Sequence, residues 1–364
     1  MPPADCATVT AFYLFDVAEQ IALPELRAQL GAAAAAARFA PGRGAPPYLQ
    51  YANPPVVADG EVLGIPPLDG FRLRVKFFDY GVLSVALSRR FSAEWPEIVA
   101  VSGRYIENEA LEEQAVGICR GLMQRFPSAM RGARERFLSE DYLVLALTPG
   151  ADRPAADALL AAHGRDIAQS LRGEGQPLST QEQDEILRHR LSYAADDLFI
   201  PTWNAAFVYD TEAGAQAALE IVEFANSQLL EFRYYDELLD VELARIYAQL
   251  QRPHWWDSLS GRGYVRAAHQ LHSLFIDVNE ITDHTQNALK MVGDIYAARL
   301  FHLTVPRLGL EVWKASVNDK LKTLNDVYRF AVEQVAISRG HFLELTIIAI
   351  LVLELVLFFM GIMT

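Results

Sequence analysis

The chain has 364 residues, of which 51% are hydrophobic, and its formal net charge is -14 at pH 7. This length allows two or three structural units with cores of their own, and the apolar content excludes an intrinsically disordered chain. The charge excludes nucleic acid as a direct ligand, because binding to a phosphate backbone rests mainly on Lys and Arg, and residues 174–242 hold fifteen acidic residues against three Arg and no Lys.

The first half of the chain carries the signals of a β-sheet. Stretches rich in β-branched and aromatic residues predict strands at residues 9–15, 73–78, 82–88, 142–148 and 205–209. The segments between them have helical patterns, so we expect an α+β domain over residues 7–210. These patterns do not fix the order of the strands.

Two segments of this domain predict irregular structure. Residues 31–70 contain a run of six alanines and several paired or closely spaced prolines, which indicates a loop or insertion with a short strand at residues 48–51. The sequence FFDYG at residues 77–81 lies between two apolar runs and predicts a hairpin turn. We expect Gly81 to supply the positive φ that such a turn needs.

After Asp210 the strand signals stop, and residues 211–304 predict a helical region. We expect helices over residues 212–240 and 241–250, and a long helix over residues 263–304 that ends at Pro306. Another long helix follows from residue 307. Two long helices joined at a proline predict an antiparallel hairpin.

Residues 307–344 predict a coiled-coil stalk, because apolar residues recur at the a and d positions of a heptad. The residues that define this stripe include Leu321, Leu324, Tyr328, Val335 and Phe342. The stripe has two explanations. It packs on a neighbouring helix of its own chain, or it pairs copies of the chain in a homo-oligomer.

Residues 345–364 predict one transmembrane helix, since twenty residues of helix measure about 30 Å, which matches the hydrocarbon core of a bilayer. The apolar residues outweigh the cost of inserting Glu354. Glu354 lies away from the coiled-coil stripe, so we expect it to face a neighbouring span or a second membrane partner. The alternative is a protonated Glu354 in lipid.

Motifs of catalysis are missing from the sequence. It contains no phosphate-binding loop, no dinucleotide fingerprint and no nucleophile elbow, so we expect no enzyme, no catalytic residue and no cofactor. His269 and His272 have the spacing of two ligands on one helix, but no third ligand is evident nearby, so no metal site is predicted. Cys6 and Cys119 are far apart, which indicates a reducing compartment.

The segment NSQLLEFRYYD combines hydrogen-bond donors, acceptors and aromatic rings within three helical turns. Its candidate residues are Asn226, Arg233, Tyr234, Tyr235 and Asp236. They form either a structural polar network, with Arg233 paired to Glu237 one turn on, or a surface that binds a protein partner.

Three parts of the sequence together resemble a known family: VKFFDYGVLSV, the stretch from YAADDLFIPTWNAAFVYD to ANSQLLEFRYYDELLD, and NDKLKTLNDVYRFAVEQVAISRGHFLELTIIAILVLELVL. They are similar to the "required for meiotic nuclear division" family, a domain of unknown function. The resemblance implies a membrane-anchored protein, with relatives in the inner mitochondrial membrane that support translation from the matrix side. No catalytic residues are established in that family, so it implies none here.

Two functions follow as hypotheses. The first is a tail-anchored membrane scaffold or adaptor, in which the lipid bilayer holds a homo-oligomer that tethers a cytoplasmic protein partner. The N-terminus has no Lys or Arg before Arg27 and so lacks the positive charge of a signal peptide or presequence. We therefore expect the bacterial inner membrane, with the N-terminal domain in the cytoplasm. The alternative is an oligomeric channel-like protein that resembles magnesium transporters, with Glu354 lining a pore.

Overall fold

The computed structural model describes residues 4–31, 35–36, 53–66, 68, 70–149, 153–251, 276 and 295–359. The chain divides into two compact units. Unit 1 comprises Met1–Tyr234 and His284–Trp313, and unit 2 comprises Tyr235–Asp283 and Lys314–Thr364.

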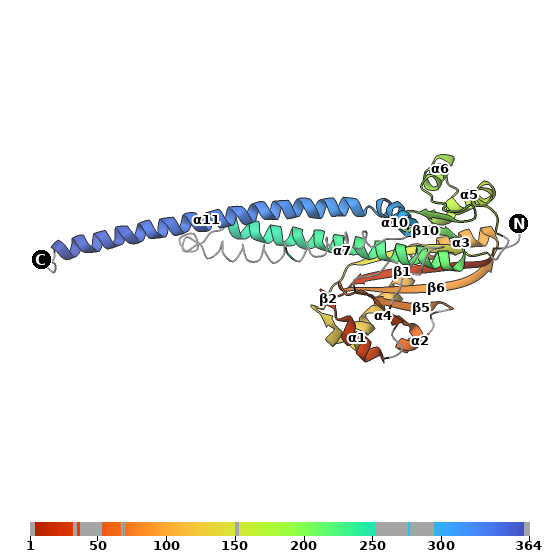
Figure 1. The fold of residues 1–364 in the computed structure, drawn as a ribbon, viewed down its shortest axis with the longest axis horizontal. Helices are drawn as coiled ribbons and strands as arrows, with labels where there is room; N and C mark the ends of the chain where they lie inside the picture. The colour runs from red at the N-terminus through yellow and green to blue at the C-terminus, as the bar shows by residue number, and fades with distance from the viewer. Residues whose placement is uncertain are drawn as a thin grey trace. The chain divides into compact units, whose positions relative to one another are not determined.

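Unit 1 is built on a large sheet, whose described strands have the order β3-β4-β5-β6-β1-β8-β10-β9 (Figure 1). The strands are β1 (Ala4–Asp16), β3 (Ala35–Ala36), β4 (Val56–Asp59), β5 (Arg72–Phe77), β6 (Val82–Ala93), β8 (Ser139–Leu147), β9 (Leu198–Pro201) and β10 (Ala205–Tyr209). A second, small sheet pairs β2 (Gln20–Ile21) with β7 (Met130–Arg131). The five strands predicted from β-branched and aromatic runs are all present, as β1, β5, β6, β8 and β10.

Helices are interleaved with these strands along the chain. The short ones are α1 (Leu23–Leu30), α2 (Gly60–Leu63), α3 (Trp95–Tyr105), α4 (Glu109–Arg125), α5 (Ala156–Arg172), α6 (Thr180–Arg188) and α10 (Ile295–Arg307). Side-chain caps fix two of their N-termini: Asn108 accepts a hydrogen bond from the Leu111 amide, and Ser179 accepts one from the Glu182 amide. The long helices are α7 (Glu212–Gln251) and α11 (Leu310–Phe359).

The predicted α+β class is wrong, because the sheet is mixed and the helices alternate with its strands. β8 and β10 pair in parallel, whereas the other described neighbours in the large sheet pair antiparallel. A parallel pair needs a crossover connection, and α5 and α6 lie in the segment that supplies it. Strand pairing of this kind depends on contacts between distant residues, which the local sequence patterns did not show.

The two faces of the large sheet bury different kinds of side chain. In β1, Val9 and Tyr13 point into a hydrophobic core that also holds residues of α1, α3, α4 and α5. Because strand side chains alternate between faces, Leu14 and Asp16 point to the opposite face. The first half of α7 contacts that opposite face, since Glu220 and Glu223 of α7 bond a side chain of β5.

The predicted hairpin turn joins β5 to β6, and Gly81 has a φ of 97° in it. A Cβ atom at this position would lie 1.9 Å from the carbonyl oxygen of Ala18, so only glycine fits. In the segment 31–70, the described residues form β3, β4 and α2. The short strand predicted at residues 48–51 lies outside the described residues.

The long helices differ from the prediction in two ways. α7 is one continuous helix, whereas two helices meeting at residues 240 and 241 were expected. The sequence around these residues contains no Gly or Pro that would break the helix. Near residue 306 the helix continues through Pro306, and the chain turns at Gly309, which has a φ of 68°. Most of the predicted helix over residues 263–304 lies outside the described residues.

Unit 2 contains the second half of α7 packed against α11. The Ser316 hydroxyl donates to the Asp236 carboxylate at 2.6 Å, and Lys320 forms ion pairs with Asp236 at 2.8 Å and Asp240 at 2.7 Å. These parts of the two helices run in the same direction (Figure 1). α11 therefore packs in parallel on the earlier helix α7, whereas the predicted antiparallel hairpin involves the helix over residues 263–304, most of which lies outside the described residues.

The structure also overturns the predicted transmembrane helix. Among the residues that it describes, no helix combines the length and the apolar character needed to cross a membrane. The anchor over residues 345–364 and the placement in the bacterial inner membrane were wrong predictions.

Candidate functional site

One face of the first half of α7 carries polar side chains that are buried. They are Glu220, Glu223, Ser227 and Glu231, which recur every three or four residues as one helical face requires. None of the four is more than 8% exposed. Because carboxylates are almost never fully buried unless they are paired, the strands beneath this face must supply partners for them.

Lys76 of β5 is the first of these partners and is only 1% exposed. Its neighbours Val75 and Phe77 lie in the hydrophobic core on the other side of the strand. The Lys76 ammonium donates to a carboxylate oxygen of Glu220 at 2.6 Å and to one of Glu223. We call Lys76, Glu220 and Glu223 the lysine cluster.

The charges of the lysine cluster affect one another strongly. Burial raises the pKa of Glu223, and the Lys76 charge opposes that effect. Burial alone would lower the pKa of Lys76, but the Glu223 and Glu220 carboxylates outweigh it and raise that pKa. The ammonium therefore stays charged, and it holds the carboxyl groups of one helix on one strand.

A second group of buried charges lies where β1 ends. Asp16 is completely buried, and its Oδ1 accepts a hydrogen bond from the Arg134 guanidinium, which also donates to the carbonyl oxygen of Ala18. The guanidinium carbon lies 3.8 Å from the centre of the Tyr234 ring. Together with Glu231, we call Asp16, Arg134 and Tyr234 the arginine cluster.

Two carboxylate oxygens of the arginine cluster are buried without a hydrogen-bond partner, Oδ2 of Asp16 and Oε1 of Glu231. Burial raises the pKa of Asp16 to about 7, although the Arg134 charge lowers it. Burial also raises the pKa of Glu231 well above its ordinary range, with a further contribution from the negative charge of Asp16. Two acids and one base are therefore enclosed here without complete hydrogen bonding.

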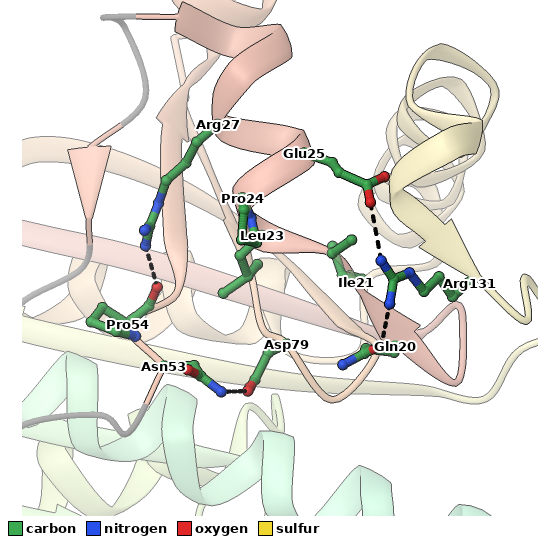
Figure 2. Close-up of a pocket in the computed structure, with 11 residues that line it drawn as sticks. Gln20, Ile21, Leu23, Pro24, Glu25, Arg27, Asn53, Pro54, Asp79 and Arg131 are labelled. Carbon is green, nitrogen blue, oxygen red and sulfur yellow. Dashed lines mark hydrogen bonds and ion pairs between the residues drawn. The ribbon is translucent and has the colours of Figure 1, made fainter.

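A cavity of about 480 Å³ opens beside α1, and Figure 2 shows its lining. The side chains on its walls already pair with one another. Arg131 bonds Glu25 at 3.0 Å, Arg27 donates to the carbonyl oxygen of Pro54 at 2.7 Å, and Asn53 donates to Asp79 at 2.7 Å (Figure 2). The cavity has the size of a small-molecule site. Its Arg131–Glu25 pair is already formed, whereas Nε of Arg27 is buried without a hydrogen-bond partner.

This arrangement favours structure over catalysis. The carboxylates of both clusters are sealed between the sheet and α7, so a substrate has no access to them, and a general acid or base must come within hydrogen-bond reach of the reacting group. The described part of the chain also contains no group of three or more His, Cys, Asp or Glu that could hold a metal ion. His269 and His272 lie outside that part.

The predicted partner surface in NSQLLEFRYYD is divided among separate contacts. Asn226 is buried and donates to the carbonyl oxygen of Val222, and Tyr235 is also buried. Arg233 pairs with Glu140 of β8 and not with Glu237. Tyr234 stacks on Arg134, as described above. In the helix pair of unit 2, Asp236 binds Ser316 and Lys320.

The predicted stalk residues have different surroundings along α11. Leu321 and Leu324 are buried, at 6% and 1% exposure, and Tyr328 is partly exposed. The side chains of Val335 and Phe342 lie outside the described part of the structure. Glu354 is exposed.

Of the residues in the two charge clusters, only Tyr234 was named from the sequence, and the others were missed. Lys76 stands between apolar residues in RLRVKFF, and a lysine at an inward position of a strand is a signal that could have been used. On α7, Glu220, Glu223 and Glu231 share a face with small and apolar residues. Their partners Asp16 and Arg134 are distant in sequence, so no local pattern joins them.

Comparison with known proteins places residues 6–216 in a protein family. The family model described as "Uncharacterized protein MJ0711, N-terminal domain" matches residues 6–216. The uncharacterized protein MJ0711 of Methanocaldococcus jannaschii is 24% identical over 191 residues, which cover 52% of this chain and 58% of that protein. The chain thus spans little more than half the length of this relative. No solved structure matches the chain.

These matches correct the resemblance drawn from the sequence. The meiotic nuclear division family was the wrong assignment, because both matches lead to the archaeal protein MJ0711 instead. The supposed likeness rested on three separate stretches, of which NSQLLEFRYYD was the most specific, and none of them identified the family. Residues beyond 216 lie outside the family match.

Proposed function

Since the chain belongs to the family of the MJ0711 N-terminal domain, whose match covers most of its sheet, we propose that it is a non-enzymatic scaffold that self-associates through the C-terminal part of α11. The end of α11 joins several copies, and each copy presents its sheet domain to a protein partner. The proposal keeps the assembly role of the first hypothesis and omits the membrane anchor. The channel-like alternative depended on a membrane span, so it is not retained.

One observation carries the proposal: the end of α11 is apolar on all sides and exposed. Eleven large apolar side chains between residues 343 and 359 are each at least 46% exposed. They are Leu343, Leu345, Ile347, Ile348, Ile350, Leu351, Val352, Leu353, Leu355, Val356 and Phe359. Monomeric proteins rarely expose an apolar patch larger than a few hundred Å², and a helix that is apolar all round is normally buried.

The heptad pattern indicates what covers this segment. Earlier in α11, Val317, Leu321 and Leu324 occupy a and d positions and are buried in unit 2, where α7 packs against α11. The same heptad register continues through Val352 and Phe359, which are 55% and 80% exposed. The apolar seam of α11 is thus covered by α7 in its first part. In its last part the same seam continues, but the described residues provide no second helix to cover it.

The number of copies follows from the width of the apolar surface. A two-stranded coiled coil covers one stripe, at positions a and d. Ile347 and Leu351 lie outside that stripe and are each 58% exposed. Packing of more than two copies around a common axis would cover them, so we expect an oligomer larger than a dimer.

Sedimentation velocity of the purified full chain tests the proposal. We expect a defined oligomer at micromolar concentration, and we expect the double variant Val352→Glu/Val356→Glu to sediment as a monomer, because each copy would bring two charges into the seam. Glu344→Lys, an exposed position of the same helix, is the matched control and should leave the oligomer intact. A wild-type chain that is monomeric over the whole concentration range refutes the proposal.

A further inference from the structure

The arginine cluster encloses more acid than base. Asp16 at the end of β1 is 0% exposed and Glu231 of α7 is 2% exposed, and each has one oxygen without a hydrogen-bond partner. Arg134 is the cation that contacts this pair. Its guanidinium bonds Oδ1 of Asp16 and also the carbonyl oxygen of Ala18. Two ionised carboxylates and one guanidinium would leave a net negative charge in a region closed to water.

The groups around Glu231 do not remove this excess. From the turn between β5 and β6, Asp79 adds a negative charge, although Asn53 bonds its carboxylate, and the Tyr80 hydroxyl is bonded to Ser227 at 2.7 Å. From α7 itself, Ser227 and Gln228 are neutral, and the Tyr234 ring lies against the Arg134 guanidinium. The excess negative charge therefore remains on Asp16 and Glu231.

We infer that Asp16 and Glu231 hold one proton between them in the folded protein at neutral pH, and that this proton keeps α7 packed on the sheet. With one carboxyl neutral, the cluster contains one carboxylate and one guanidinium, and its charges cancel. When the proton leaves, a second buried carboxylate appears with no cation to pair with. An uncompensated buried charge strongly destabilises a fold.

The direction of the pH dependence follows from linkage. The pKa of Asp16 rises from 3.8 to about 7 on folding, mainly through burial, and that of Glu231 rises as well. The folded chain therefore binds more protons than the unfolded chain above about pH 4, so its stability falls as the pH rises toward and through about 7. Below about pH 4 both states are protonated and this penalty is absent.

Urea unfolding of the full chain from about pH 5 to about pH 8 tests the inference against Glu231→Gln. Glutamine keeps the size of the side chain but carries no charge, so Asp16 can then ionise beside Arg134. Relative to this variant, the folding equilibrium constant of the unsubstituted chain should fall by about tenfold per pH unit, the effect of one proton. Glu237→Gln, an exposed position of the same helix, should behave like the unsubstituted chain. Equal pH slopes for the chain and Glu231→Gln would overturn the inference.

A second measurement does not depend on the variant folding. Carbon-13 resonances of the side-chain carboxyls in the unsubstituted chain report the protonation of each acid directly. We expect at least one of Asp16 and Glu231 to titrate near or above neutral pH. If both complete their titration below about pH 5, as ordinary carboxyls do, no proton is held and the inference is wrong.

Discussion

The first half of α7 and the end of α11 reverse the usual distribution of side chains in opposite ways. α7 buries Glu220, Glu223 and Glu231 against a sheet, whereas α11 exposes Leu351, Phe359 and their neighbours. Both arrangements are unfavourable in isolation, because buried charges lose their hydration and exposed apolar surface orders water or aggregates. Each reversal therefore indicates a compensating partner.

The partners differ in where they are found. For α7 they lie in the same unit, as Lys76 and Arg134, and the pairing is visible atom by atom. For the end of α11 the described residues supply no covering surface, so the proposed partner is another copy of the chain. The buried charges of α7 are therefore stabilised within one chain, whereas the exposed apolar end of α11 indicates assembly with other copies.

The largest expected effect comes from removing the cation of the lysine cluster. Lys76→Met leaves Glu220 and Glu223 buried without their ammonium, and breaking a buried ion pair in this way costs about 3–5 kcal/mol. Urea unfolding at neutral pH measures the loss of unfolding free energy. Lys322→Met, at an exposed lysine on α11, is the control and should change it by less than about 0.5 kcal/mol.

A companion variant separates charge from packing in that experiment. Lys76→Met combined with Glu220→Gln and Glu223→Gln removes the uncompensated charge and should recover part of the lost stability. If the combined variant is no more stable than Lys76→Met alone, the lysine cluster acts through packing and its electrostatic interpretation fails.

The next largest effect tests the covered part of the heptad seam. Leu324 is 1% exposed, so Leu324→Ala should cost about 2–4 kcal/mol of unfolding free energy through the cavity that it creates. Ile337→Ala, at a position of the same helix that is 49% exposed, should cost much less. Similar losses for both variants would mean that α11 gains nothing specific from packing on α7.

The smallest effect concerns a neutral hydrogen bond in the buried layer. Tyr80→Phe removes the hydroxyl that bonds Ser227 at 2.7 Å, and we expect a loss of about 1 kcal/mol. Thermal unfolding followed by circular dichroism is sensitive enough to detect it. If Tyr80→Phe lost as much unfolding free energy as Lys76→Met, the large effect expected at the lysine cluster could not be attributed to its charges.

The sequence predicted those features that local patterns encode. The strands β1, β5, β6, β8 and β10 and the turn at Gly81 follow from side-chain type and spacing over a few residues. The parallel pairing of β8 with β10 and the packing of α11 on α7 join residues far apart in the chain, so no local pattern specified them. The heptad in α11 was recognised, but a heptad states only that a helix is covered and does not identify the partner.

The candidate site was less predictable than the fold. A buried Lys76 or Asp16 differs from a surface residue only in what lies around it, and that depends on the folded sheet. The segment NSQLLEFRYYD is polar and aromatic, but its residues make separate contacts from different sides of a helix. The predicted membrane span was wrong, because no described helix combines the length and the apolar character that crossing a membrane needs.

Cysteine crosslinking of the full chain tests most directly the claim that copies meet at the end of α11. In a chain with Cys6→Ser and Cys119→Ala, a single Val352→Cys should form intermolecular disulfides rapidly and in high yield under mild oxidation. Asp319→Cys, at an exposed position where α11 packs on α7, should form few. Equal yields at the two positions, or none at Val352→Cys, would contradict the account.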